Sequence, residues 1–169
     1  MAAELLVIVV LPALLALAAG WDLASFTIPN LLQAALLAVF VVFVLTSGMS
    51  QVAIGWHLLA GLLGLAVGFT LFALGYIGGG DAKLFACVAL WLGFHDLASY
   101  ALLASLAGGV LTLSLLAVRR LPLPAILTTH NWLLRLHDER AGIPYGVALA
   151  AAAFFIIPQT EIFRLAAGV

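Results

Sequence analysis

Asp22 and Asp81 are the two residues of this chain whose type and placement suggest chemistry. Each lies at the end of an apolar segment, where a charged side chain is costly and usually marks a functional position. Two neighbouring carboxylates cannot both ionise easily, so a close pair shares one proton. One carboxylate can then activate water as a general base, while its protonated partner donates to an amide. The pair suggests peptide-bond hydrolysis if the fold brings both residues to one place.

The composition indicates an integral membrane protein. The 169 residues are 66% hydrophobic and 8% charged, whereas soluble domains carry about 25% charged residues. Residues 1–169 are therefore expected to form one membrane domain, with room for five to seven spans of roughly 20 residues. A net charge of -1 leaves no basic face for nucleic acid. The single cysteine, Cys87, excludes an internal disulfide and a multi-cysteine zinc site, and no metal or cofactor is expected.

Apolar runs interrupted by Gly, Pro or charge predict an all-α, polytopic membrane helix bundle with about six transmembrane helices. The predicted helices cover residues 3–19, 31–46, 52–75, 82–94, 97–118 and 145–157. The first run lacks the positive start of a signal peptide, so it is interpreted as a span. Six spans place both termini on one side and the segments 20–30, 76–82 and 119–143 on the other.

The distribution of Lys and Arg predicts the orientation. Arg164 alone lies on the side of the termini, and the segments near the aspartates carry the other five basic residues: Lys83, Arg119, Arg120, Arg135 and Arg140. Cytoplasmic loops carry the excess of Lys and Arg. We therefore expect the termini outside and both aspartates at the cytoplasmic face. Lys83 fits this anchoring role better than a catalytic one.

The fourth predicted span is unusually short. Its roughly 13 residues would reach about 20 Å, against a hydrocarbon core of about 30 Å, which predicts that Asp81 is recessed below the surface. Gly78, Gly79 and Gly80 precede it, and we expect them to supply irregular backbone through positive φ and close approach. Two simpler interpretations remain open: Asp81 as an ordinary N-cap, and Asp22 as a loop residue in the headgroup layer.

Helix dipoles suggest different roles for the two carboxylates. Asp81 is expected at the start of a helix, where negative charge is favoured, and Asp22 just past the end of one, where it is disfavoured. On this basis Asp81 would be the base and Asp22 the proton carrier, although coupled groups resist individual assignment.

Two further segments are expected to support the bundle. Gly64 and Gly68 form a small-residue pair that allows close helix packing. Residues 131–140 are interpreted as a short amphipathic interfacial helix or, equally, as a polar loop.

These residues resemble the type IV prepilin peptidases, which belong to the GxGD class of intramembrane aspartyl proteases. The matching residues are Asp22 with Ile28, Pro29 and Asn30 after it; Gly78, Gly80, Asp81 and Lys83; Leu84, Ala86, Trp91, Leu92 and Gly93; and Ile143, Pro144, Tyr145 and Gly146. The resemblance implies that Asp22 and Asp81 are catalytic. It also implies a supporting role for Gly78, Gly80, Lys83, Pro29 and Asn30.

The resemblance further implies a substrate and a location. The substrate would be a prepilin or pseudopilin with a short basic leader and one hydrophobic helix, cleaved at the cytoplasmic face of the bacterial inner membrane. Larger members carry a cytoplasmic insertion with paired cysteines and methylate the new amine. This chain has no room for that insertion, so it resembles the short, peptidase-only form that serves tight-adherence (Flp) pili. Residues 23–27 also lack the basic residues often found there. The lipid bilayer is a further partner, and a homo-oligomer remains open.

Two other functions fit parts of the pattern. A helix broken by glycines, with an acid at its start and a second acid facing it, could form the site of a proton- or cation-coupled small transporter. No repeat is evident between the halves of the chain, which counts against transport. In a noncatalytic pilus assembly factor, the aspartates would only pair with Lys83 or with arginines.

Overall fold

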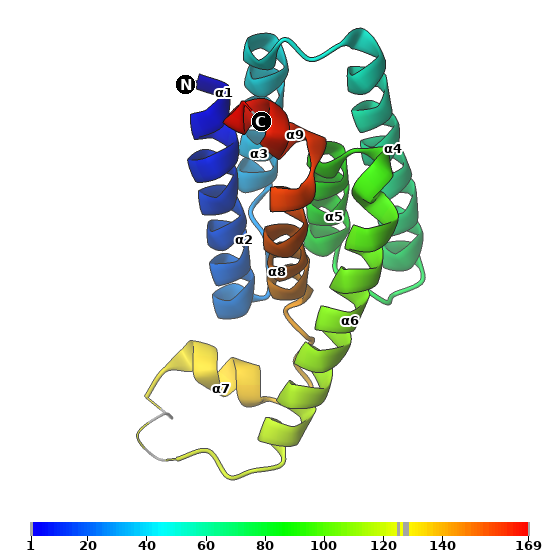
Figure 1. Ribbon diagram of the computed structural model, residues 1–169. Helices are drawn as coiled ribbons and strands as arrows, with labels where there is room; N and C mark the ends of the chain where they lie inside the picture. The colour runs from blue at the N-terminus through cyan, green and yellow to red at the C-terminus, as the bar shows by residue number, and fades with distance from the viewer. Residues whose placement is uncertain (1, 125, 127–128, 169) are drawn as a thin grey trace.

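The computed structural model describes residues 2–124, 126 and 129–168, and this part of the chain is helical without β-strands (Figure 1). Its main elements are α1 (Ala2–Leu5), the π-helix η1 (Leu6–Val10), α2 (Leu11–Ser25), α3 (Asn30–Ser47), α4 (Gln51–Ala73), α5 (Gly79–Leu92), α6 (Phe94–Arg119), α7 (Asn131–His137), α8 (Tyr145–Ile156), the 3-10 helix η3 (Ile157–Gln159) and α9 (Glu161–Ala167). The prediction of an all-α polytopic bundle is confirmed.

The helices divide into full-length spans and shorter pieces. Within the described residues, four helices are long and apolar enough to cross a membrane: Ala3–Ser25, Asn30–Ser47, Gln51–Ala73 and Phe94–Arg119. A fifth span is formed if α8–η3 and α9 are counted together across their 57° bend. The protein is thus a multi-pass membrane protein. The 14 residues of α5 extend only about 21 Å, as the sequence predicted for the fourth helix.

Helix α5 lies inside the bundle, and α4 packs along it. Ten of the 14 residues of α5 are buried. A Cβ added at Gly64 would lie 2.7 Å from the Cβ of Ala89, and one at Gly68 would lie 2.9 Å from the carbonyl oxygen of Ala82. Both distances are shorter than ordinary contact, so the glycines allow the two backbones to approach closely. The predicted packing role of Gly64 and Gly68 is confirmed.

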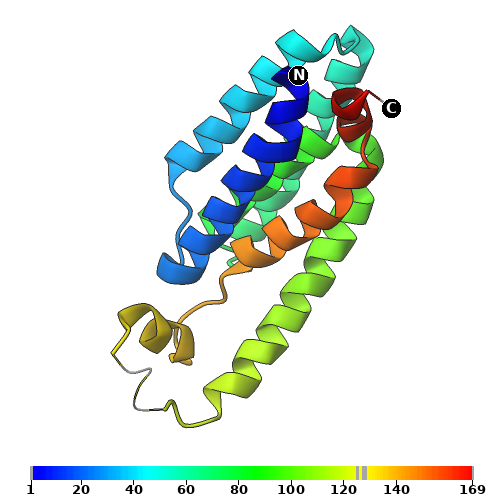
Figure 2. The same ribbon diagram turned by 60° about the vertical axis from the view of Figure 1, so that its left-hand side comes forward.

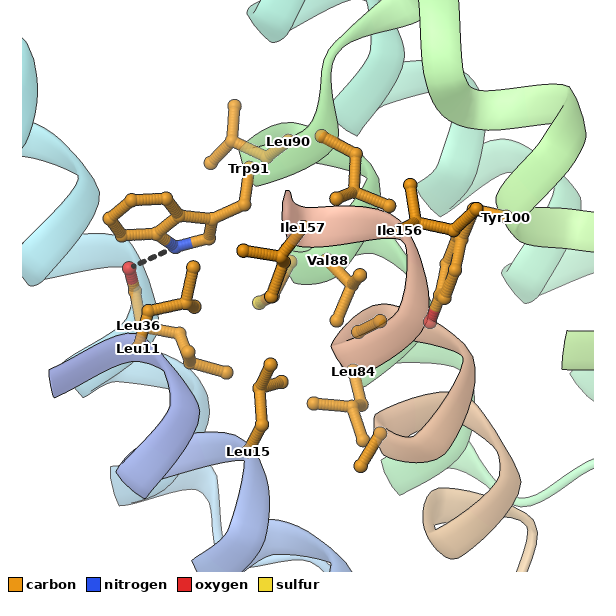
Figure 3. Close-up of a cluster of buried hydrophobic side chains, with 14 of the residues drawn as sticks. Leu11, Leu15, Leu36, Leu84, Val88, Leu90, Trp91, Tyr100, Ile156 and Ile157 are labelled. Atoms are coloured by element: carbon orange, nitrogen blue, oxygen red, sulfur yellow. Dashed lines mark hydrogen bonds between the residues drawn. The ribbon is translucent and has the colours of Figure 1, made fainter. Parts of the chain in front are cut away.

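Aromatic and aliphatic side chains fill the space between α5 and its neighbours (Figure 3). The buried indole of Trp91 donates a hydrogen bond from Nε1 to the carbonyl oxygen of Leu36 on α3, at 3.0 Å. Phe40 and Phe43 of α3 pack against the same ring. A buried Trp needs a partner for its N–H, and this bond therefore fixes the height of α3 relative to α5.

The two ends of the bundle differ in what they carry. Both termini lie at one end, and the α2–α3 connection, the α4–α5 connection and the C-terminal end of α6 lie at the other (Figures 1 and 2). This agrees with the predicted separation of the termini from the aspartate segments. Helix α7, which confirms the helical interpretation for Asn131–His137, lies beyond that second end of the bundle.

A buried arginine ties the segment after α7 to α6. Arg119 donates to the carbonyl oxygens of Leu136, Ala141 and Gly142 at 2.8, 3.2 and 2.9 Å. Arg119 is only 6% exposed, so these bonds satisfy donors that would be expensive to leave unpaired. The segment leading into α8 is therefore fixed by the end of α6.

Candidate active site

Asp22 belongs to the last turn of α2. The prediction that it follows the end of the first helix is wrong: the apolar run ends near Ala19, but the helix continues to Ser25 because its backbone hydrogen bonds do not require apolar side chains. The helix then ends at Phe26, whose left-handed φ of 56° is unusual for a residue with a Cβ. Asp22 is 3% exposed. Its Oδ2 accepts a 2.7 Å hydrogen bond from the backbone N–H of Gly146.

Asp81 occupies the first turn of α5. Gly78 is the N-cap, and the Asp81 Oδ2 atom reaches back to accept from the Gly78 N–H at 3.2 Å. Asp81 thus caps its helix from within the first turn rather than standing at the N-cap itself. Its side chain is 8% exposed, so it is buried within the protein; its depth below the membrane surface stays a prediction.

The glycines before Asp81 work by close approach and not by positive φ. Gly78 has a φ of -72°, and none of the three glycines is left-handed; the left-handed glycine of this connection is Gly75. A Cβ at Gly80 would lie 3.3 Å from both the Cβ and the backbone nitrogen of Ile28. The small residue lets the start of α5 contact the α2–α3 connection. The positive-φ part of the expectation is wrong, and the close approach is confirmed.

Asp22 and Asp81 line one cavity of about 290 Å³. The residues around it are Asp22, Phe26, Thr27, Ile28, Asn30, Gly78, Gly79, Gly80, Asp81 and Lys83. The two carboxylates also interact electrostatically. The fold therefore brings together two acids that are 59 positions apart in the sequence.

Most of the other residues singled out in the sequence lie at this cavity. Lys83 Nζ donates to Asn30 Oδ1 at 2.9 Å and so links the starts of α5 and α3. Pro29 is absent from the lining; it is the N-cap residue of α3, and its carbonyl oxygen accepts from the Leu32 N–H. Pro29 therefore acts through the backbone, by setting where α3 begins.

The sequence did not reveal the role of Gln33. Its side chain is 5% exposed and donates from Nε2 to the carbonyl oxygen of Gly80 at 3.0 Å. This bond fixes the backbone immediately before Asp81 to α3. A polar residue inside an otherwise apolar span was the available signal, because such residues are expensive unless paired.

Gly146 is the second residue whose role at the site was missed. It lies in the first turn of α8, and a Cβ there would be 2.8 Å from Asp22 Oδ2 and 2.8 Å from Ile28 Cδ1. Glycine is therefore required for its N–H to reach Asp22. Because Asp22 accepts a bond at the start of one helix and Asp81 at the start of another, the dipole contrast that assigned base and acid is lost.

The cavity carries two acid–base groups, Asp22 and Asp81. Across residues 2–124, 126 and 129–168, no group of three or more His, Cys, Asp or Glu could hold a metal ion. Two nearly buried carboxylates that face one cavity can share a proton and hold a water between them.

The comparison with protein families gives one match. A family model described as the type IV leader peptidase family matches residues 9–113, a segment that contains both aspartates, the glycines before Asp81 and all of α3 to α5. Comparison with curated proteins gave no match, and neither did comparison with solved structures. Because the matched segment covers more than half of the chain, this protein belongs to the type IV leader peptidase family.

Proposed function

We propose that this protein is an aspartic endopeptidase that removes the leader from Flp-type prepilins or pseudopilins at the cytoplasmic face of the bacterial inner membrane. The observation that carries the proposal is the shared cavity. Asp22 and Asp81 come from different helices, each is nearly buried, and each accepts a hydrogen bond from a backbone N–H. Family membership supports the choice of a peptide bond as the target.

In the proposed reaction, the two aspartates hold one proton and one water molecule between them. The ionised carboxylate takes a proton from the water, and the water oxygen bonds to the carbon of the scissile carbonyl. The protonated partner donates to the carbonyl oxygen. The C–N bond then breaks as the leaving nitrogen takes the proton that the base received from the water, and the carbonyl reforms as one of its two hydroxyl groups returns a proton to the ionised partner. The products are the leader's carboxylic acid and the amine of the mature pilin. Either aspartate can serve as the base.

The orientation rests on the basic residues at the aspartate end of the bundle. Lys83, Arg119 and Arg135 all belong to the end that carries the cavity, whereas Arg164 lies on α9 with the termini. By the positive-inside rule, this end faces the cytoplasm. The leader of a prepilin would then meet the aspartates without crossing the membrane.

The absence of methyl transfer is part of the proposal. Residues 26–29 alone connect α2 to α3, so this connection offers no room for an insertion with paired cysteines. Cys87, the single cysteine, is buried in the α3–α5 contact. We therefore expect the enzyme to leave the new amine unmethylated.

The test uses purified protein in lipid vesicles with a synthetic prepilin, a short Lys-rich leader joined to one apolar helix of about 20 residues. A methyl donor is supplied, and the products are identified by mass spectrometry. We expect one cut between leader and helix with a free amine, no cut with Asp81→Asn, and a normal cut with Glu139→Gln, an exposed acid at the same end. An intact substrate with the wild-type protein would refute the peptidase proposal, and a methylated product would refute the peptidase-only form.

A further inference from the structure

We infer that the apolar groove between α3 and α4, with α5 as its floor, binds the hydrophobic helix of the substrate while the adjoining segment enters the carboxylate cavity. This inference rests on the proposed function and adds the path by which a membrane-embedded substrate reaches the site. The groove has a volume of about 440 Å³. Its lining residues are Asn30, Gln33, Ala34, Leu37, Leu58, Gly61, Leu62, Leu65, Lys83, Ala86, Cys87 and Leu90.

The groove exists because α4 packs against α5 rather than against α3. Although α3 and α4 are consecutive, they make little or no direct contact, whereas α4 lies along α5 over much of its length. Small residues line the floor and the α4 wall beside it: a Cβ at Gly61 of α4 would lie 3.0 Å from the Cβ of Leu90, and Cys87 and Ala86 follow Leu90 on α5 towards the carboxylates. Small side chains at the floor allow another helix to approach closely.

The groove is continuous with the cavity that holds the two aspartates. Asn30 and Lys83 line both spaces, and the 2.9 Å bond between their side chains marks the junction. From this junction the lining extends along α4 from Leu65 to Leu58, a distance of about 10 Å or two helical turns. A helix in the groove would therefore direct its end into the carboxylate cavity.

The order of polarity matches the proposed substrate. Polar side chains lie at the end that meets the cavity, and the remainder of the lining is almost entirely apolar. A prepilin has the same order, because its polar leader and scissile bond precede an apolar helix. Lipid acyl chains would also cover an apolar surface. They cannot hydrogen-bond with the polar junction that opens onto the two carboxylates, whereas a polypeptide can.

A second groove provides the rival path. Between α4 and α6, two smaller spaces of about 280 and 170 Å³ share Val67, Phe85 and Ala101, and the second of them reaches Asp81. Asp22 lines neither of these spaces. The α3–α4 groove is favoured because it meets the cavity that contains both carboxylates.

Two matched substitutions, each replacing an alanine by tryptophan, distinguish between the two substrate paths. Ala34 lines the α3–α4 groove and Ala98 the α4–α6 groove, and both side chains are exposed, so an indole at either place fills a groove without entering the core. We expect Ala34→Trp to lower cleavage of the synthetic prepilin by about tenfold or more, because a displaced helix misplaces the scissile bond. Ala98→Trp should remain within about twofold of wild type. Membrane abundance and thermal unfolding of both variants show that the bundle is intact.

Photo-crosslinking measures binding without requiring turnover. In the Asp81→Asn background, p-benzoylphenylalanine at Leu62 in the groove should crosslink to the prepilin helix. The same group at Leu102, a lipid-facing position on α6 that lines neither groove, should not crosslink to the prepilin. The two positions are matched in exposure, at 66% for Leu62 and 64% for Leu102.

The outcomes distinguish the groove from the proposed function. Normal cleavage by Ala34→Trp with no crosslink at Leu62 overturns the groove and leaves the peptidase standing. Loss of cleavage in Ala98→Trp alone moves the substrate to the α4–α6 side. A Leu62 crosslink with no cleavage by the wild-type protein supports the groove and refutes the peptidase.

Discussion

The hydrogen bond from Gly146 to Asp22 can be weakened by adding a single methyl group at Gly146. In Gly146→Ala the new Cβ would lie 2.8 Å from Asp22 Oδ2 and 3.0 Å from its Cγ, whereas ordinary contacts begin near 3.4 Å. Ile28 Cδ1 would also lie 2.8 Å from this Cβ. Since the backbone of α8 is fixed by its own helix, the carboxylate must retreat by roughly half an ångström, which stretches the 2.7 Å bond to about 3.2 Å, the upper end of the range for an N–H···O hydrogen bond.

The expected effect is a loss of activity in a protein that stays folded. A 1 Å misplacement of a reacting group can cost about 100-fold in rate, so a displacement of about half that size is expected to cost about tenfold. Loss of a charge-assisted hydrogen bond costs about 1.5–3 kcal/mol of unfolding free energy. Replacing glycine by alanine in a helix raises the free energy of unfolding by about 0.4–1 kcal/mol, because the unfolded chain loses conformational freedom. Even if the bond is lost entirely, the net loss of stability is about 0.5–2.6 kcal/mol, which should leave the folded protein in the membrane.

The assay compares cleavage of the synthetic prepilin with thermal unfolding for Gly146→Ala and for Gly109→Ala. Gly109 is an exposed glycine inside α6 with open space around its Cα. The control should cleave normally and unfold at the same temperature or slightly higher. If Gly146→Ala is stable and cleaves within about twofold of wild type, the Gly146 N–H does not position Asp22, and the reasoning is refuted.

Three further changes test neighbouring parts of the structure. Gly80→Val forces a branched side chain against Ile28 beside Asp81, so cleavage should fall strongly at near-normal abundance; full activity would contradict this. Gly68→Ala places a Cβ 2.9 Å from the Ala82 carbonyl oxygen and should lower the unfolding temperature while the remaining folded protein cleaves normally. Arg119→Lys loses the forked contact with three carbonyl oxygens, and limited proteolysis should then cut residues 129–142 faster; an unchanged digestion rate would refute this role of Arg119.

The sequence located the two carboxylates because charge is rare in this chain and expensive in a bilayer. The short helix that begins near Asp81 could also be predicted, because the length of its apolar run is visible in the sequence. A 14-residue apolar helix cannot reach across the hydrocarbon core. The end of α2 could not be located in this way. The end of the apolar run indicates where contact with lipid ends. The helix continues to Ser25, because backbone hydrogen bonds do not depend on apolar side chains.

The partners of the carboxylates were harder to predict because they depend on tertiary contacts. Gly146 lies 124 positions from Asp22, and nothing local in the sequence shows that the start of α8 meets the end of α2. For the glycines before Asp81, the sequence predicted the close approach correctly and the positive φ wrongly. Gly80 lies close to Ile28 in the packed bundle, but its φ is not positive.

The central claim is that Asp22 and Asp81 act as one unit, and a double-mutant comparison tests it most directly. The residual rate of prepilin cleavage is measured over long incubations for Asp22→Asn, Asp81→Asn and the double variant, each at wild-type membrane abundance. Groups that act together are strongly non-additive, so the double variant should be no slower than either single variant, and all three should be at background. A single variant that retains the wild-type rate would remove that aspartate from the reaction. Two partial losses that multiply in the double variant would show that the aspartates act independently.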